Sequence, residues 1–347
     1  MKGMILENIK DLAKTDQPLT LKELPKPEPG PDDVLIKVTV CGVCHTELDE
    51  IEGRTAPPDF PVVPGHEVVG IVKQCGDRVT EVNTGERVGV AWIYSACGEC
   101  EHCLEGDENL CHNFTATGRD VNGGYAEYMV APASFVYRIP GSIPDEQAAP
   151  MMCAGAIGYR SLMLAEIENE KRLGLTGFGA SGHLVLKLSR YLYPDTDIYV
   201  FARSEKQREF ALELGAAWAG DTEEESPQKL HAIIDTTPVW KPVVEALKNL
   251  EPAGRLVINA IRKEDADIDY LLNLDYTEHL WKEKEIKSVA NVTRKDVSEF
   301  LNVAAEIPIE PDVTLYSLEE ANSALMQIKQ GGGKGAVVLK VNDTDTV

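Results

Sequence analysis

The spacing of hydrophobic and polar residues changes character near residue 155. Before that point, short runs rich in β-branched residues are separated by turns rich in proline and glycine, a pattern typical of short β-strands. The clearest runs span residues 33–40, 67–74, 86–92 and 125–132. The pattern predicts that the chain from about residue 19 to 136 is rich in β-structure and has few helices.

From about residue 155 to 291, strand-like runs alternate with segments of helical period. The expected strands span residues 172–177, 197–202, 231–237, 254–260 and 285–291, and the expected helices span 181–192, 204–216 and 241–250. This alternation predicts βαβ units on a parallel sheet. Residues 294–341 have the pattern helix, helix, strand and are expected to return to the first domain. We therefore expect an α/β protein with one domain formed by residues 1–154 and 291–347 and a second by residues 155–290.

A glycine motif lies between the first strand of the second domain and the helix that follows it. Its spacing, G-x-G-x-x-G, is formed by Gly177, Gly179 and Gly182. A strand before the motif and an amphipathic helix after it are the context in which this spacing indicates a dinucleotide site. An ordinary glycine turn is the alternative. The residues expected to contact the cofactor here are Gly177, Gly179, Ala180, Ser181 and Gly182.

The end of the next strand bears on which dinucleotide is bound. An NAD-binding protein places an acidic residue there to bind the adenosine ribose. This chain instead has Ala202, Arg203 and Ser204. Because no acid would repel a 2′-phosphate and Arg203 could pair with it, NADP(H) is favoured and NAD(H) remains the alternative. A solvated charge at the start of the next helix is the simpler interpretation of Arg203.

Four of the eight cysteines lie within the loop at about residues 95–112. Two residues separate each of the first three, and seven precede the fourth. Four thiolates suit a closed structural zinc site. An iron–sulfur cluster is less favoured because the C-x2-C-x2-C run of ferredoxins continues with x3-C-P, and free or redox-active thiols are the third possibility. The expected ligands are Cys97, Cys100, Cys103 and Cys111.

A second set of possible metal ligands is dispersed along the chain. Cys44, His66 and Cys153 would supply the three ligands of a catalytic zinc, which keeps its fourth position open. Taken singly, each has a simpler interpretation, since cysteine is often a small buried hydrophobe and a lone histidine in a strand is usually a core residue. Spacing alone leaves both interpretations open.

Composition excludes some classes of partner. The chain has 347 residues, 43% of them hydrophobic, and a formal net charge of −23. This charge repels nucleic acid and anionic membrane surfaces. No apolar run suits a signal peptide or a membrane span. We expect a cytoplasmic protein that acts on small molecules.

Several motifs in one order resemble the zinc-dependent alcohol dehydrogenases of the medium-chain dehydrogenase/reductase superfamily. These are "CGVCHTEL", "PGHEVVG", "CGECEHCLEGDENLC", "GGYAEYM", the cysteine of "MMCAGAIGY", and "GFGASG". The resemblance covers nearly the whole chain. It implies a GroES-like catalytic domain and a Rossmann domain, a catalytic zinc on Cys44, His66 and Cys153, and a structural zinc on the four-cysteine loop. It also implies reversible hydride transfer between a nicotinamide cofactor and an alcohol/aldehyde pair.

The resemblance also assigns roles to single residues. Thr46 matches the hydroxyl residue that contacts the substrate oxygen and begins a proton relay. Asp49 stands where a histidine commonly ends that relay, so Asp49 is either the outer base or, since Thr46-x-x-Asp49 resembles a capping box, a helix-capping residue. Glu67, which follows a zinc ligand, is included among the catalytic residues. Trp92 matches a wall of the substrate pocket, which favours a small primary alcohol, with a buried core aromatic as the alternative.

Two further positions depart from the family pattern. Glu47 replaces the aspartate that is commonly hydrogen-bonded to the histidine ligand, so the orientation of His66 could differ. Ala336 replaces an arginine that often binds the cofactor pyrophosphate, and His45 or Lys334 would partly substitute for it. The family also forms dimers and tetramers, so a homo-oligomer is expected. A dinucleotide-binding protein of this fold that has lost turnover is the alternative function.

Overall fold

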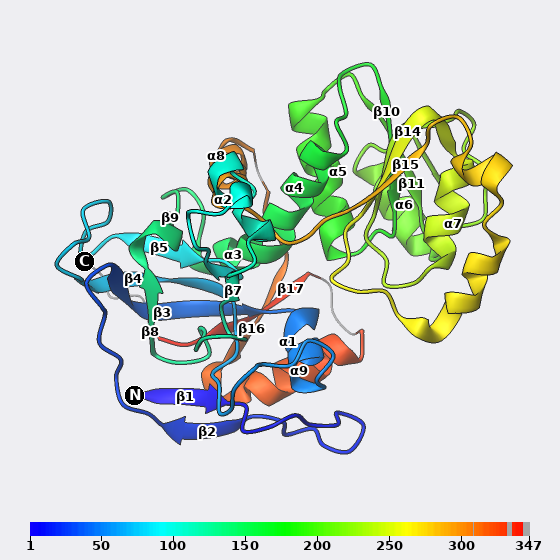
Figure 1. Cartoon of the computed structure of the whole chain (residues 1–347). Helices are drawn as coiled ribbons and strands as arrows, with labels where there is room; N and C mark the ends of the chain where they lie inside the picture. Colours follow the sequence, from blue (N-terminus) through cyan, green and yellow to red (C-terminus); the bar gives the residue numbers. More distant parts are fainter. Residues whose placement is uncertain (308, 332–334, 343–347) are drawn as a thin grey trace. The chain divides into compact units, whose positions relative to one another are not determined.

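The computed structural model describes residues 1–307, 309–331 and 335–342, and it describes only the backbone of Ala180. The chain forms two compact units (Figure 1). Unit 1 comprises Met1–Ala156 and Asn291–Val347, and unit 2 comprises Ile157–Ala290. Among the described residues, no helix is both long and apolar enough to cross a membrane.

Unit 1 is built on a seven-stranded sheet. Its strand order is β16-β17-β3-β4-β5-β9, and β8 also pairs with β3. All pairs are antiparallel except β16–β17. The strands are β3 (Asp33–Val43), β4 (Glu67–Cys75), β5 (Arg87–Val90), β8 (Tyr128–Pro132), β9 (Val136–Arg138), β16 (Val313–Ser317) and β17 (Ala336–Lys340). Residues from both ends of the sequence therefore share one sheet.

Short elements surround this sheet. Two antiparallel ribbons pair β1 (Lys2–Ile5) with β2 (Thr20–Glu23) and β6 (Ile93–Ser95) with β7 (Thr115–Ala116). The helices are α1 (His45–Ile51), α2 (Glu101–Glu105), α3 (Asp145–Pro150), α8 (Arg294–Glu306) and α9 (Ala321–Lys329). The short helical turns are η1 (Glu108–Leu110), η2 (Ala133–Phe135), the π-helical η3 (Met151–Gly155) and η6 (Leu318–Glu320).

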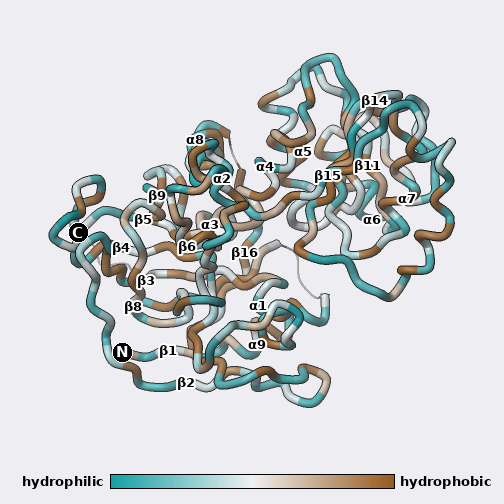
Figure 2. Tube along the Cα trace, in the orientation of Figure 1, coloured by the Kyte–Doolittle hydropathy of each residue, from teal (hydrophilic) through white to brown (hydrophobic). Residues whose placement is uncertain are grey.

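The core of unit 1 holds these elements in place. Val34, Ile36 and Val38 of β3 are fully buried and belong to one apolar cluster with residues of α1 and α9. Figure 2 shows the hydrophobic colouring concentrated along the strands, while the outer loops are mostly hydrophilic. Burying one such side chain stabilises the fold by about 1.5–3 kcal/mol. The cluster therefore gives α1, which begins beside Cys44, a fixed support.

Unit 2 contains a six-stranded sheet in the order β12-β11-β10-β13-β14-β15, with every pair parallel. This is the doubly wound order of dinucleotide-binding folds. The strands are β10 (Arg172–Thr176), β11 (Asp197–Phe201), β12 (Trp218–Gly220), β13 (Leu230–Asp235), β14 (Leu250–Ile258) and β15 (Glu285–Ser288). The helical elements are α4 (Ala156–Leu164), α5 (Ala180–Leu192), α6 (Glu205–Glu213), α7 (Lys241–Lys248), η4 (Asp265–Asn273) and η5 (Tyr276–Leu280). The prediction of an α/β fold with a β-rich part and a parallel sheet is confirmed.

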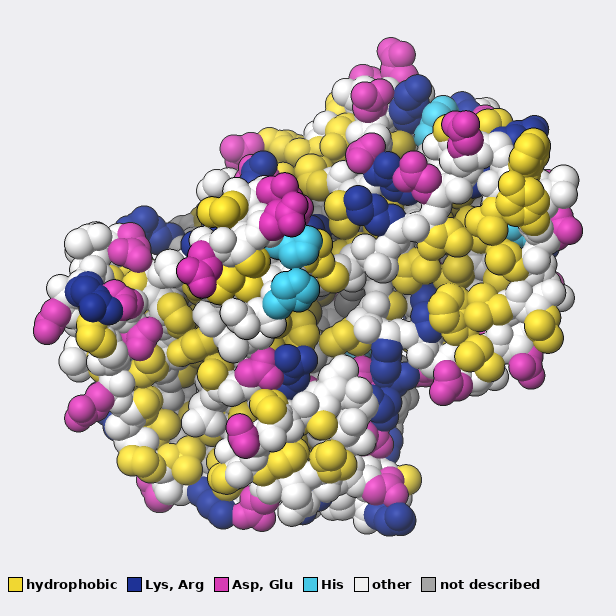
Figure 3. Space-filling model, in the orientation of Figure 1, with side chains coloured by type: hydrophobic (Ala, Val, Ile, Leu, Met, Phe, Trp, Pro, Cys, Tyr) yellow, Lys and Arg dark blue, Asp and Glu magenta, His cyan; other side chains and the backbone are white. Residues whose placement is uncertain are grey.

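Charged side chains of both signs are mixed on one face of the molecule. Figure 3 shows acidic and basic side chains interspersed on the face that it presents. Exposed ion pairs such as Lys2–Glu319 (2.8 Å) and Arg78–Asp32 join oppositely charged groups. Such pairs contribute about 0–1 kcal/mol each, so they shape the surface more than they stabilise the fold.

Candidate active site and metal centres

The three dispersed metal-ligand candidates come together in unit 1. Cys44 directly precedes α1, His66 directly precedes β4, and Cys153 lies in the turn η3. Ligand atoms of these residues and of Glu67 all lie within 4.8 Å of one another. Cys44 Sγ is 3.6 Å from His66 Nε2, which matches the edge of about 3.5–3.8 Å expected between ligands of a tetrahedral zinc with bonds of about 2.0–2.3 Å. The residues therefore fit a zinc ion with two sulfur ligands and one nitrogen ligand.

Glu47 orients two of these ligands. Its Oε1 lies 2.6 Å from Nδ1 of His66, and both side chains are almost fully buried. Its Oε2 accepts a hydrogen bond of 2.8 Å from the backbone N–H of Cys44. A carboxylate on Nδ1 leaves Nε2 as the nitrogen that can bind metal. Glu47 therefore lies where it could orient His66, as an aspartate commonly does in the family.

The electrostatics of the site suit a cation. Burial acts to lower the pKa of His66, but the negative charge of Glu47 and the contact with Cys44 outweigh burial and raise this pKa well above its usual value. A hydrogen bond with Cys153 and burial raise the pKa of the Cys44 thiol well above its usual value. These raised pKa values favour the protonated imidazole and thiol. A bound metal ion has the opposite effect, because it favours thiolate and neutral imidazole. Metal binding here would therefore release protons.

Two further buried carboxyl groups are near the ligands. Burial raises the pKa of Glu67 to about 7, and burial together with the neighbouring Glu47 raises the pKa of Glu50 to about 8. Glu67 is within ligand distance of the site. Glu50 was not a sequence candidate, and its place one helical turn after Thr46 in α1 is the signal that could have found it.

The relay candidates Thr46 and Asp49 lie on α1. The helix is capped by Cys44, which accepts from the N–H of Thr46 at 3.3 Å, and Glu47 completes the capping box. The interpretation of Thr46-x-x-Asp49 as the capping box is therefore wrong, because the helix begins two residues earlier than that pattern requires. Asp49 is buried, and its Oδ1 accepts a hydrogen bond of 2.5 Å from Nε of Arg54.

Trp92, the predicted pocket wall, is half-buried just before β6. Its indole Nε1 donates to Glu50 Oε1 at 3.5 Å, and its ring lies 5.4 Å from that of Phe114. The Arg119 guanidinium lies 5.4 Å from the ring centroid. These contacts fix the indole beside the helix that contains Thr46.

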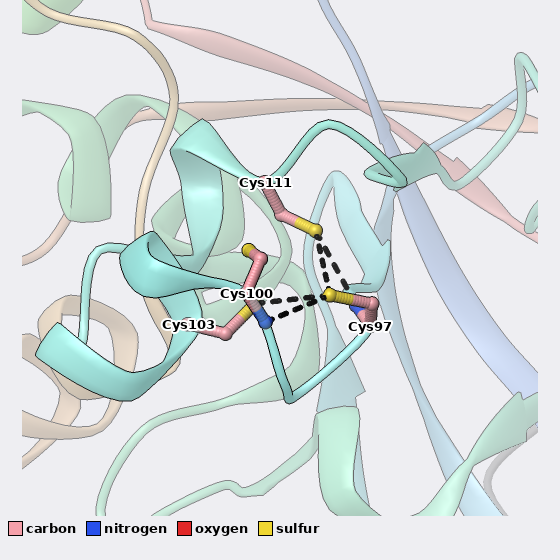
Figure 4. Close-up of side chains that lie close together, drawn as sticks. All are labelled: Cys97, Cys100, Cys103 and Cys111. Carbon is pink, nitrogen blue, oxygen red and sulfur yellow. Dashed lines mark hydrogen bonds between the residues drawn. The ribbon is translucent and has the colours of Figure 1, made fainter.

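The four cysteines of the loop converge on one point (Figure 4). Cys97 Sγ lies 3.9 Å from Cys103 Sγ and 3.5 Å from Cys111 Sγ. These distances are far longer than a disulfide bond of about 2.05 Å and again match a tetrahedral edge. All four ligand atoms lie within 4.8 Å of one another, so the loop fits a closed zinc site.

Backbone N–H groups in this loop donate to the cysteine sulfurs, which favours the thiolate form. The N–H groups of Cys97 and Asn113 donate to Cys111 Sγ, and the N–H of Cys100 donates to Cys97 Sγ. Hydrogen bonds from the backbone of Glu99 and Cys100 lower the pKa of Cys97 to about 6, whereas desolvation raises the pKa of Cys103 to about 12. The loop thus offers thiolate first at Cys97.

In unit 2, the glycine motif joins β10 to α5. Gly177 has φ +78°, and a Cβ there would lie 2.8 Å from Thr237 Cγ2. A Cβ on Gly182 would lie 2.7 Å from the carbonyl oxygen of Gly177. A Cβ on Gly179 would meet no atom within 4 Å. Glycine is therefore required for the turn at Gly177 and for close packing at Gly182, and open space lies beside Gly179, the N-cap of α5. This space and the N–H groups of α5 fit an anionic pyrophosphate. Ser181 follows in the first turn of α5.

The residues expected to choose between NADP and NAD directly follow β11. Ala202 is buried, and Arg203 and Ser204 are exposed, with Ser204 at the N-cap of α6. Sequence reasoning missed Arg208, whose Nη1 donates to the carbonyl oxygens of Ala202 at 2.8 Å and Arg203 at 3.1 Å. Its position one helical turn after Ser204 is the signal that could have found it. Arg208 therefore fixes the backbone of this strand end.

A buried network beside the glycine turn was also missed. Asp235, at the end of β13, accepts from Thr176 Oγ1 at 2.5 Å and forms an ion pair with Lys263. Lys263 also donates to the carbonyl oxygen of Thr237 at 2.6 Å. These contacts join the carboxyl ends of neighbouring strands, where ligands of this fold bind.

Three further positions were considered for the cofactor pyrophosphate. His45 is exposed at the first position of α1, and Ala336 is the first residue of β17. Lys334 lies outside the described residues.

Known proteins similar to this chain identify the family. Residues 30–141 match the model "Alcohol dehydrogenase GroES-like domain". The chain is 40% identical over 320 residues to "Probable alcohol dehydrogenase AdhA" of Mycobacterium tuberculosis, with 91% of this chain and 90% of the relative covered. It is 34% identical to an alcohol dehydrogenase of Geobacillus stearothermophilus, with 94% and 96% covered. Its structure resembles a cinnamyl alcohol dehydrogenase of Sorghum bicolor with a TM-score of 0.81, 26% identity and 99% of each chain covered. The chain belongs to the zinc-dependent alcohol dehydrogenases of the medium-chain dehydrogenase/reductase superfamily.

Proposed function

We propose that this alcohol dehydrogenase interconverts small primary alcohols and their aldehydes with NADP(H), using one catalytic and one structural zinc per chain. The observation that supports this most directly is the convergence of Cys44, His66 and Cys153 within ligand distance. Three protein ligands leave a tetrahedral ion one position for the substrate oxygen. The complete ligand set argues against a binding protein that has lost turnover.

Zinc held there would act as a Lewis acid that favours the alkoxide form of the alcohol. Four groups of the chain itself have tasks beside it. Glu47 holds His66 in the metal-binding orientation, Thr46 accepts the hydrogen bond of the alcohol hydroxyl, and Asp49 is the proposed outer proton acceptor. Glu67, buried with a raised pKa of about 7, would adjust the charge around the ligands as it gains or loses its proton.

The preference for NADP(H) rests on the end of β11. No carboxylate occupies positions 202–204, and exposed Arg203 can meet a 2′-phosphate. The glycine turn would receive the pyrophosphate, with His45 as a further cationic or hydrogen-bonding contact. Among solved structures of this fold, a Helicobacter pylori enzyme is described with NADP(H) and a Geotrichum candidum acetophenone reductase with NAD. Both cofactors must therefore be compared directly.

The size of the substrate rests on Trp92. Its ring is fixed by Glu50 and Phe114, so it cannot turn away from a bulky alcohol without breaking both contacts. Two proteins named "Probable cinnamyl alcohol dehydrogenase", from Pinus radiata and Pinus taeda, are 32% identical to this chain. An aromatic primary alcohol such as cinnamyl alcohol is therefore the second candidate substrate.

We further propose a cytoplasmic homo-oligomer. All eight cysteines are free thiols, which suits a reducing compartment. Strand β15 is an edge of the unit 2 sheet, and all four of its residues are exposed. Exposed apolar side chains nearby in the sequence include Leu272, Tyr276, Trp281 and Ile286. An unpaired edge with apolar neighbours is a surface that pairing between copies would cover.

The test is a kinetic comparison of NADP with NAD over a series of primary alcohols from ethanol to cinnamyl alcohol. We expect higher kcat/KM with NADP and with short alcohols. Cys44→Ala should abolish turnover while the fold persists. Zinc content with no turnover on any alcohol or aldehyde, with either cofactor, would instead identify a retired binding protein.

A further inference from the structure

The four-cysteine loop is attached to a distant helix by one buried carboxylate. Glu108 lies in η1, between Cys103 and Cys111, and only 4% of its surface is exposed. Its Oε1 accepts hydrogen bonds from the backbone N–H of Arg294 at 2.9 Å and from Arg294 Nε at 3.0 Å. The two residues are 186 positions apart in the sequence. Figure 1 shows α8 beside α2, in agreement with this contact.

Glu108 meets α8 at the end where a carboxylate stabilises a helix most. Arg294 is the first residue of α8, so its N–H has no partner within the helix. A negative charge at this end also interacts favourably with the helix dipole. The Arg294 guanidinium packs over the buried ring of Phe135 at 4.8 Å, which holds the ion pair in one geometry. The loop therefore fixes the start of α8.

A second contact of α8 is with the turn η3, which contains Cys153. Phe300, fully buried in α8, lies against Gly155 at the end of η3. A Cβ on Gly155 would lie 2.3 Å from Phe300 Cζ and 2.4 Å from Cε1. Since backbone and ring are in direct contact, a shift of α8 must move either the ring or the turn. Cys153 is two residues before Gly155.

We propose that Glu108, Arg294 and Phe300 connect the four-cysteine loop to the Cys153 turn and are positioning residues for the catalytic metal. Metal in the loop fixes Glu108, Glu108 fixes α8, and Phe300 supports the backbone that presents Cys153. The inference rests on the proposed function, because it takes Cys44, His66 and Cys153 as the ligands of the catalytic metal. It predicts that breaking the connection accelerates loss of metal from these three residues.

The experiment measures zinc release from the purified full-length protein to a chromogenic chelator. The phase that belongs to the catalytic site is identified as the one that Cys153→Ser removes. We expect Glu108→Ala and Phe300→Leu to accelerate this phase about tenfold, the lower end of what loss of a ligand-orienting partner costs. Glu108→Gln keeps the acceptor oxygen and should restore most of the wild-type rate.

Two control variants separate this connection from general destabilisation. Glu86→Ala removes a carboxylate that pairs with Arg138 at 2.8 Å in the same unit, and Leu325→Ala removes a buried side chain of α9. Neither variant should accelerate zinc release from the catalytic site as much as Glu108→Ala and Phe300→Leu do. Phe300→Leu provides the test if Glu108→Ala does not fold.

The possible outcomes are distinct. Wild-type release rates in folded Glu108→Ala and Phe300→Leu, or equal acceleration in Leu325→Ala, would overturn the connection and leave the metal assignment intact. If Cys153→Ser removes no phase, the metal assignment of the proposed function fails together with the connection. None of these readouts depends on turnover.

Discussion

Glu47 Oε1 lies 2.6 Å from His66 Nδ1, and both side chains are buried. We expect Glu47→Gln to weaken zinc binding at the catalytic site about 10–100-fold. The reason is that the carboxylate charge both orients the imidazole and increases the basicity of the imidazole, and the variant removes this charge. Competition with a chelator measures this affinity. Glu52→Gln changes a carboxylate that pairs with Arg54 near the end of the same helix, and equal weakening in this variant would refute a specific role of Glu47.

We predict that the chain binds two zinc ions and that the four-cysteine loop holds one of them. Cys100→Ser is expected to lower the zinc content from two to one per chain, or below, and to lower the free energy of unfolding by about 4 kcal/mol or more. Metal analysis and denaturant unfolding measure both effects. Cys75→Ser is the matched control, since Cys75 donates to the carbonyl oxygen of Val82 at 3.5 Å and belongs to neither cluster. A coloured protein containing iron would contradict the zinc assignment.

Arg203 should decide between the two cofactors. Arg203→Ala is expected to lower kcat/KM for NADP about tenfold or more, as for the loss of a charged hydrogen bond, and to leave NAD little changed. Lys206→Ala removes another exposed charge three residues later and serves as the control. Equal or better efficiency of the wild-type enzyme with NAD would show that this strand end does not select NADP.

Asp49 should accept the proton that the alcohol hydroxyl releases through Thr46. We expect Asp49→Asn to lower the rate of alcohol oxidation at neutral pH by about 10²-fold, the lower range for general base catalysis. The deficit should narrow at high pH, where solvent hydroxide accepts the proton. If the pH profile keeps its shape and only thermal stability falls, Asp49 serves the ion pair with Arg54 instead.

His231 should make stability depend on pH. Burial and the nearby charge of Arg172 lower the pKa of this imidazole, and its Nδ1 accepts from the N–H of Arg172 at 3.1 Å. Below the ordinary histidine pKa of about 6.5, the unfolded chain takes up a proton that the folded protein does not. The free energy of unfolding therefore decreases as the pH is lowered. His231→Asn removes this titration. From pH 7.5 to 5.5, the free energy of unfolding should decrease more in the wild type than in His231→Asn. An equal decrease in both proteins would show that His231 does not cause the pH dependence.

The sequence predicted elements whose signals are local. The alternating runs gave β10, α5 and β11, and the close spacing of Cys97, Cys100, Cys103 and Cys111 required them to share one loop. Strand β12 was missed because three residues at a sheet edge have no recognisable period. Segment 265–280 was missed because its apolar residues remain largely exposed in η4 and η5 and follow no core-facing pattern.

Contacts between distant residues could not be predicted in this way. Glu47 and His66 belong to separate motifs, and the family resemblance, not the local pattern, pointed to the contact between this carboxylate and the imidazole. The pairs Glu108–Arg294 and Asp235–Lys263 each join segments whose charges are ordinary in the sequence. Even the start of α1 was misjudged, because a thiol at Cys44 occupies the cap position that hydroxyl and amide residues usually fill.

The pairing of β17 with β3 has a consequence for the order of events during translation. Val337 of β17 lies opposite Val43 of β3, next to Cys44. About 180 residues separate β17 from the end of the first segment of unit 1, so at the usual rates of synthesis the nascent sheet waits about 10–40 s for this neighbour. Unit 2 is continuous in sequence and can complete its sheet within that interval. Strand β3 therefore gains this neighbour only late in synthesis, and a ribosome that stalls before residue 336 leaves that edge of β3 open to other nascent chains.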